Sequence, residues 1–182
     1  KKPEVFFLFK HCTAIPPAPP AAIHLRTIIQ SITLNTLTAV TINEIQDEII
    51  EEFCELDDWM DRYQLLIDLG EEQAPLPDSD KTDQNLIDGC QSRVWITCEE
   101  HDGHLDFRAE SDALIVKGIV SLVIRVVNHQ TPKDILDAKL YFIDKIGLTE
   151  HLSPTRSNGL LAMIKQVRMY ALAFQTKLEE NK

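Results

Sequence analysis

The segment from residue 111 to residue 127 constrains the fold more than any other part of this sequence. Ser111 and Asp112 precede a run that is apolar on nearly every side. Such a pair is typical of a helix start, where the serine caps the helix and the acidic residue lies in the first turn. The run is too short to cross a bilayer, which needs about 20 apolar residues, so we expect no membrane-spanning segment. We predict a buried core helix, with Gly118 packed closely against another element.

A β-hairpin is predicted immediately before this helix. Val94, Ile96 and Cys98 alternate with residues that point the other way, as in a strand with one buried face. Residues 101–104 supply an Asp-Gly turn, and residues 105–109 return as the partner strand. Cys98 should therefore lie on the core face of the hairpin.

Helix signals lie on both sides of the hairpin. Thr41 and Glu44 have the spacing of a capping box, and Asp57 or Asp58 could cap a second helix, with Gly70 as its C-terminal stop. After the core helix the pattern predicts a short helix capped by Thr131 and another from Tyr141 to Ile146. Residues 153–158 are expected to form a rigid loop and cap before a long helix, whose one face carries Leu160, Ile164, Val167, Ala171 and Phe174. Helices, a small antiparallel sheet and further helices together predict an α+β domain.

Residues 1–39 differ from the rest of the chain. They contain a proline-rich run from Pro16 to Pro20 and a short apolar segment from Val5 to Phe9. That apolar segment is shorter than a secretory h-region, which has about 7–15 apolar residues. We expect residues 1–39 to be disordered, as a leader, a non-native extension or sequence upstream of a misassigned start. Residues 40–182 should form the folded domain.

Cys90 lies just before the hairpin and is the candidate nucleophile. A polar loop over residues 71–88 and a turn-forming Asp-Gly pair lead into it, so the thiol should be reachable by a large partner. Gln91, Ser92 and Arg93 supply hydrogen-bond donors that could stabilise a thiolate or a persulfide anion. The alternative from the residues alone is a buried structural cysteine at the start of a strand.

Three segments, in a common order, carry a resemblance to a known family. They are residues 89–95 (GCQSRVW), 111–118 (SDALIVKG) and 148–160 (LTEHLSPTRSNGL). Together they resemble the SufE/CsdE family of sulfur-acceptor proteins, over about residues 41–178. The resemblance implies the SufE fold, which is shared with IscU-like scaffold proteins: a small antiparallel sheet packed with helices.

The resemblance also implies a sulfur-transfer function centred on Cys90. In the family, a cysteine in an exposed loop accepts sulfur as a persulfide from a pyridoxal-phosphate-dependent cysteine desulfurase of the SufS or CsdA type. It then passes the sulfur to the SufBCD scaffold for iron–sulfur cluster assembly. By this match Cys90 is the persulfide acceptor, and Gln91, Ser92 and Arg93 are supporting residues. The protein would be an accessory that activates the desulfurase, with no independent turnover and no cofactor of its own.

Two further residues are assigned by the same resemblance. Asp112 and Arg156 are implied to lie near the sulfur loop or on the partner surface. Their ordinary interpretations are an acidic residue at a helix N-terminus and an arginine bound to loop carbonyls. Thr155 stands where the family more often has serine, and the hydroxyl is retained.

A metal- or iron–sulfur-binding scaffold of the IscU-like fold is the alternative function. Cys98, His101 and His104 have two-residue spacings of the kind that occur in zinc sites. A fourth ligand is missing, and Cys98 should face the core. A scaffold also needs several cluster ligands, whereas the loop holds a single cysteine.

Net charge restricts the partners. At −11 the chain is too acidic to favour nucleic-acid binding through phosphates, but it can be steered towards a basic patch on a protein. The four cysteines contain no CxxC pair, which favours a reducing, cytoplasmic location. The sequence leaves open which desulfurase is the partner, whether the protein forms a homodimer, and how Cys90 is oriented at rest.

Overall fold

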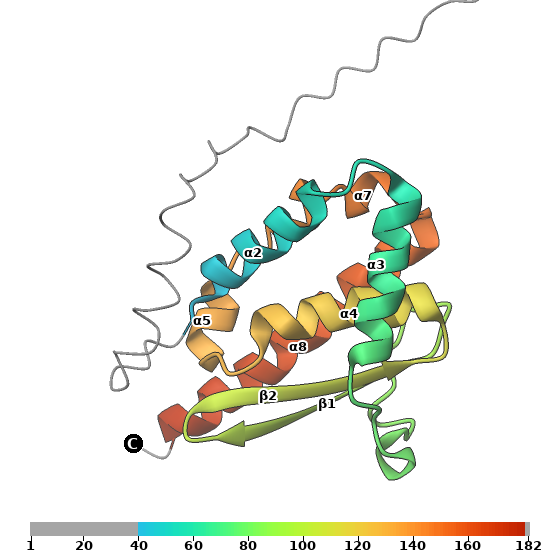
Figure 1. The fold of residues 1–182 in the computed structure, drawn as a ribbon. Helices are drawn as coiled ribbons and strands as arrows, with labels where there is room; N and C mark the ends of the chain where they lie inside the picture. Colours follow the sequence, from blue (N-terminus) through green and yellow to red (C-terminus); the bar gives the residue numbers. More distant parts are fainter. Residues whose placement is uncertain (1–39, 181–182) are drawn as a thin grey trace, which may run out of the picture. The chain divides into compact units, whose positions relative to one another are not determined.

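The computed structural model describes residues 40–180, so the prediction of disorder for residues 1–39 concerns a segment outside this range. Within it, helices pack against one β-hairpin that runs along one side, the α+β arrangement expected from the sequence (Figure 1). In chain order the elements are α2 (Ile42–Cys54), α3 (Trp59–Glu72), the 3-10 turn η1 (Asp78–Asp80), β1 (Val94–His101), β2 (His104–Ser111), α4 (Leu114–Val127), α5 (Pro132–Asp137), α6 (Phe142–Lys145), α7 (Leu148–His151) and α8 (Pro154–Glu180).

Helix α4 is the buried core helix predicted from the sequence. Nine of its 14 residues are buried, and it contacts α2, α3, α8 and β2. In Figure 1 it lies in the middle of the described part, with α3 crossing it and the hairpin running beside it. Packing on several sides therefore explains why the helix is apolar almost all round. No helix in residues 40–180 is both long and apolar enough to cross a membrane.

The predicted hairpin is confirmed. Strands β1 and β2 pair antiparallel over their full lengths. Asp102 and Gly103 form the turn with φ values of 52° and 81°, which suit the twist of a two-residue hairpin. One face of the hairpin is buried in the core through Val94, Ile96, Leu105, Phe107 and Ala109.

Two glycines bring α3 and α4 into close contact. A Cβ on Gly118 would lie 1.9 Å from the backbone oxygen of Leu66, and a Cβ on Gly70 would lie 2.9 Å from the backbone nitrogen of Gly118. The expected close packing of Gly118 is therefore confirmed. The predicted end of α3 at Gly70 is wrong, because this glycine is a buried contact surface and the helix continues to Glu72.

Several other helix boundaries follow the local signals. Thr41 and Glu44 form the capping box of α2, Asp58 caps α3, and Thr131 caps α5. Helix α6 lies within the predicted segment, and Gly147 follows it with φ 78°. These boundaries were predictable because residues within one turn satisfy the helix-end groups.

The predicted cap of α4 is wrong. Ser111 ends strand β2, and the N-cap of α4 is Ala113, which makes no side-chain capping bond. Asp112 also lies outside the helix rather than in its first turn. Both side chains instead bind the backbone of Arg93, which lies opposite them at the end of the hairpin.

The predicted loop over residues 153–158 is also wrong, because α8 begins at Pro154. Proline is well suited to a first helical position, where its missing N–H would have no partner in the helix. The buried face of α8 carries Gly159, Leu160, Met163, Val167 and Ala171, with Ile164 and Phe174 partly buried beside the core.

Candidate functional site

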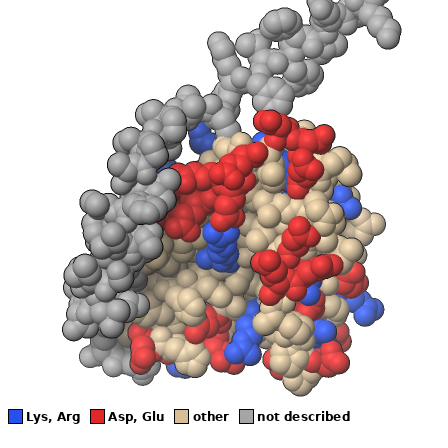
Figure 2. Space-filling view, viewed as in Figure 1, with Lys and Arg blue, Asp and Glu red and all other residues tan. Residues whose placement is uncertain are grey.

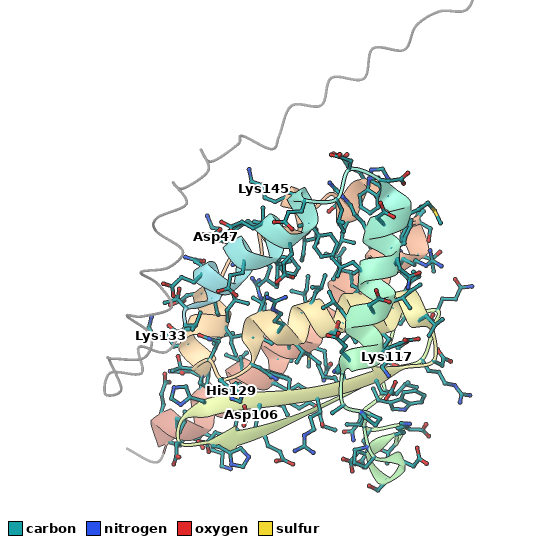
Figure 3. All side chains as sticks on the ribbon, in the orientation of Figure 1. Asp47, Asp106, Lys117, His129, Lys133 and Lys145 are labelled. Atoms are coloured by element: carbon teal, nitrogen blue, oxygen red, sulfur yellow. The ribbon has the colours of Figure 1, made fainter. Side chains whose placement is uncertain are left out.

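The long connection between α3 and β1 is anchored to the hairpin. Buried Leu76 donates its backbone N–H to Glu110 (3.3 Å), whose carboxylate also binds Lys117 of α4 (2.9 Å). Lys117 is labelled in Figure 3. Burial by itself would raise the pKa of Glu110, but these two hydrogen bonds hold it below its usual value. Further along, Ile87 donates its N–H to the carbonyl of Val94 (2.8 Å). The connection is thus fixed at several points on its way to the candidate thiol.

A clamp holds the chain directly after Cys90. The carboxylate of Asp112 accepts the backbone N–H of Arg93 (3.0 Å), and the hydroxyl of Ser111 donates to the Arg93 carbonyl (3.0 Å). The backbone N–H of Asp112 donates to the same carbonyl (3.3 Å). The end of the loop that carries Cys90 is therefore bound through its main chain, while the Arg93 side chain is exposed.

A half-open pocket of about 340 Å³ lies beside Cys90, between the loop, α4 and the start of α8. Val116 and Ile119 from α4 and Met163 from α8 supply a buried apolar lining. The polar lining comes from Gln91, Ser92, Ser153, Thr155 and Arg156. Arg156 is the charged residue of this set, so the pocket combines an apolar lining with one positively charged residue.

The thiol of Cys90 is half-buried and faces α8. Its Sγ donates a hydrogen bond to the backbone oxygen of Gly159 (3.5 Å), and burial raises the pKa of the thiol. A carbonyl oxygen can only accept, so this contact favours the thiol over the thiolate. At neutral pH the resting side chain is therefore protonated. The donors of Gln91, Ser92 and Arg93, which the sequence suggests as thiolate partners, do not lower this pKa.

The structure brings together some of the predicted site residues. Gln91, Ser92 and Arg156 line the pocket beside Cys90. Arg93 and Asp112 do not line it, and they meet instead in the clamp at the end of the loop.

Sequence reasoning did not assign the rest of the lining to the site: Val116, Ile119, Ser153, Thr155, Gly159 and Met163. For Gly159 a signal existed, because a glycine inside a helix is about 1 kcal/mol less favourable than alanine and so points to a close contact. The identity of that contact was not readable, because Cys90 lies 69 residues away in sequence.

The second cysteine of the hairpin region has a different environment. Cys98 packs beside the core, and burial, with the negative charges of Asp106 and Glu99, raises its pKa to about 12. His101 pairs with Glu99 (3.3 Å). Within residues 40–180, no group of three or more His, Cys, Asp and Glu side chains could hold a metal ion. The zinc alternative at Cys98, His101 and His104 therefore has no ligand cluster in the described part of the chain.

Comparison with known proteins agrees with this architecture. Among solved structures, the fold is similar to the solution structure of a hypothetical protein from Thermus thermophilus, with a TM-score of 0.61 and 20% sequence identity. That match covers 72% of this chain and 96% of the other, and it shows a shared fold. A family model described as "SufE: Fe-S metabolism associated domain" matches residues 47–171, which is more than half of the chain and includes Cys90 and its pocket. The chain therefore belongs to the SufE family of domains associated with iron–sulfur metabolism.

Proposed function

We propose that this protein is a sulfur carrier that accepts persulfide sulfur on Cys90 from a pyridoxal-phosphate-dependent cysteine desulfurase of the SufS or CsdA type. It then delivers the sulfur to a SufBCD-type scaffold for iron–sulfur cluster assembly. The observation that carries the proposal is the position of Cys90, in a loop at the side of a half-open pocket, on a chain of the SufE family. The carrier domain is residues 40–182, and a cytoplasmic location goes with it because a reducing compartment keeps the acceptor thiol free of disulfide bonds.

Loading is a thiol–persulfide exchange. The Cys90 thiolate attacks the outer sulfur of the desulfurase persulfide, and a new S–S bond forms on Cys90 while the desulfurase S–S bond breaks. The desulfurase cysteine leaves as a thiolate. Delivery repeats the exchange, with a thiolate of the scaffold attacking the outer sulfur and Cys90 leaving. Both steps conserve electrons, so the carrier needs no redox cofactor.

The pocket suits the interval between loading and delivery. Val116, Ile119 and Met163 exclude water on one side, and Arg156 offers a positive charge to a persulfide anion on the other. Gln91 and Ser92 add polar groups from the loop itself. Because the resting thiol is protonated and half-buried, transfer requires the loop to move outwards towards a partner.

The charge of the molecule fits a protein partner with a basic docking surface. Acidic side chains gather over α2 and the start of α3 on the face shown in Figure 2. With a net charge of −11, the chain would be attracted to a positively charged partner before contact. Association with the desulfurase should therefore slow as salt is added.

Intact mass spectrometry tests the proposal. The protein is incubated with a cysteine desulfurase and free cysteine, beside Cys90→Ser and, as a matched control, Cys98→Ser. We expect added mass of one or more sulfur atoms on the wild type and on Cys98→Ser, removed by reductant. We expect none on Cys90→Ser. Sulfur on the Cys90→Ser chain, or none on the wild type with a desulfurase shown to be active, would overturn the proposal.

A further inference from the structure

We propose that Gly159 is a positioning residue for Cys90: the missing side chain at this point of α8 leaves a seat that holds the thiol inwards. The inference rests on the proposed function, because it names the residue that controls when the carrier thiol is available. Neither the resemblance nor the family match assigns a role to this glycine.

The first support is steric. A Cβ placed on Gly159 would lie 3.2 Å from the Sγ of Cys90 and 3.9 Å from its Cβ. Outside the glycine's own stretch of helix, it would meet no other heavy atom of the described residues within 4 Å. Carbon–sulfur contacts this short are strained. Any side chain larger than hydrogen would therefore push specifically against the thiol.

The contrast with Gly118 shows why this contact can be adjusted. A Cβ on Gly118 would lie 1.9 Å from the backbone oxygen of Leu66 in α3, and relieving that clash would require one of the two packed helices to move. The atom that faces Gly159 belongs to a side chain in a loop outside any helix or strand. A small steric push at Gly159 would be relieved by moving Cys90 outwards, while α8 keeps its place in the core.

The second support is chemical. The backbone oxygen of Gly159 accepts the hydrogen bond of the Cys90 thiol (3.5 Å). A neutral thiol satisfies this acceptor, whereas a thiolate would bring a negative charge against it. The other groups that line the pocket from α4 are apolar, and Arg156 from α8 is the charged one. The seat therefore favours the protonated side chain, and ionisation of Cys90 favours its release.

This arrangement links reactivity to position. Seated, Cys90 is protonated and half-buried, and so a weak nucleophile towards stray oxidants and electrophiles. Out of the seat, its pKa returns towards that of a free cysteine and the thiolate fraction rises. A desulfurase that draws the loop outwards would activate the thiol by the same movement that exposes it.

The test is Gly159→Ala, with Asn158→Ala as the matched control. Asn158 is exposed in the same helical turn and does not line the pocket. Alkylation of Cys90 by iodoacetamide is followed across pH by peptide mass spectrometry, with Cys98 as an internal reference. We expect Gly159→Ala to speed Cys90 alkylation at neutral pH at least about threefold and to lower its apparent pKa, because the thiol has left its seat. Cys98 should be unchanged, and Asn158→Ala should match the wild type for both cysteines.

A double-mutant cycle read out by Tm separates the contact between Gly159 and Cys90 from the general effect of alanine on helix stability. In a Cys90→Ala background, Gly159→Ala should raise the Tm by about 2–4 °C, because alanine is the better helix former. With Cys90 present, that rise should be reduced or lost. The proposal is overturned if Gly159→Ala changes the Tm equally in both backgrounds. It is also overturned if the rate and pH profile of Cys90 stay at wild-type values, or if Cys98 becomes more reactive in parallel.

These readouts are independent of the sulfur-carrier proposal. Alkylation and unfolding need no desulfurase, whereas sulfur loading does. If Gly159→Ala releases the thiol but the wild type takes up no sulfur, the seat stands and the carrier function fails. If Cys90 takes up sulfur but its alkylation rate is the same in Gly159→Ala and the wild type, the carrier function is supported and the positioning role of Gly159 is wrong.

Discussion

Two cysteines, one just before strand β1 and one within it, have similar burial but different surroundings. Both are half-buried, and burial raises the pKa of both. Cys98 lies within the strand beside the core, where the negative charges of Asp106 and Glu99 raise its pKa further, to about 12. Cys90 lies in a loop, next to a pocket that contains Arg156. The comparison teaches that two cysteines with similar burial can differ in backbone setting, a loop against a paired strand, and in the charged residues around them.

Thiol labelling should show the largest difference between the two cysteines. At pH 7.5, iodoacetamide should modify Cys90 at least about tenfold faster than Cys98, because burial and the carboxylates of Asp106 and Glu99 suppress the thiolate of Cys98. Site-resolved mass spectrometry of the native protein gives both rates in one sample. Equal rates, or faster labelling of Cys98, would remove the distinction.

Weakening the clamp at Arg93 should widen the difference in alkylation rate between Cys90 and Cys98. Asp112→Ala removes the carboxylate that accepts the Arg93 backbone N–H, so the loop should leave its resting position more often. We expect Cys90 alkylation, measured by the same site-resolved method, to rise about two- to fivefold. Stability in urea unfolding should fall by about 1 kcal/mol, the usual worth of one such hydrogen bond.

Asp112→Asn is the matched control for the clamp. The amide oxygen of asparagine can still accept the Arg93 N–H, so its Cys90 alkylation rate should stay close to the wild type. An equal effect of Ala and Asn would mean that charge near the loop, and not the hydrogen bond, sets the rate.

The clamp also shows where prediction from the sequence fails. A Ser-Asp pair before an apolar run predicts a helix cap, and locally nothing contradicts it. In the folded chain the hairpin brings Arg93 opposite the pair. The backbone N–H and carbonyl of Arg93 form hydrogen bonds with the side chains of Asp112 and Ser111. The core helix, the hairpin and the caps at Thr41, Asp58 and Thr131 were predictable because their partners lie within a few residues.

The candidate site divides in the same way. Cys90, Gln91 and Ser92 could be chosen from one short segment, and Arg156 from its resemblance to a family segment. Gly159 and the apolar lining could not, because they become neighbours of Cys90 only when α8 packs against the loop. For the same reason the contact role of Gly70 was misjudged as a helix stop, since Gly118 comes near it only through the packing of α3 on α4.

The smallest expected effect is on the stability of the protein at alkaline pH, through the titration of Cys98. Because folding raises the pKa of Cys98 from 9.0 to about 12, its stabilising contribution is complete below pH 9 and is lost as pH rises towards 12. As pH rises, the free energy of unfolding should fall by about 1 kcal/mol less in Cys98→Val than in the wild type. This figure allows for the partial exposure of Cys98. Urea unfolding at about pH 8 and about pH 11, on either side of the ordinary thiol pKa, measures it. Identical losses in both proteins would show that Cys98 does not titrate with unfolding.

Site-resolved sulfur loading tests the central claim most directly. The wild-type protein is incubated with a cysteine desulfurase and cysteine carrying labelled sulfur, then trapped with an alkylating reagent and digested. The account predicts labelled sulfur on the peptide that contains Cys90 and none on the peptide that contains Cys98. Label on the Cys98 peptide, or equal label on both, would contradict it, because the loop and pocket around Cys90 would then not decide where sulfur is carried.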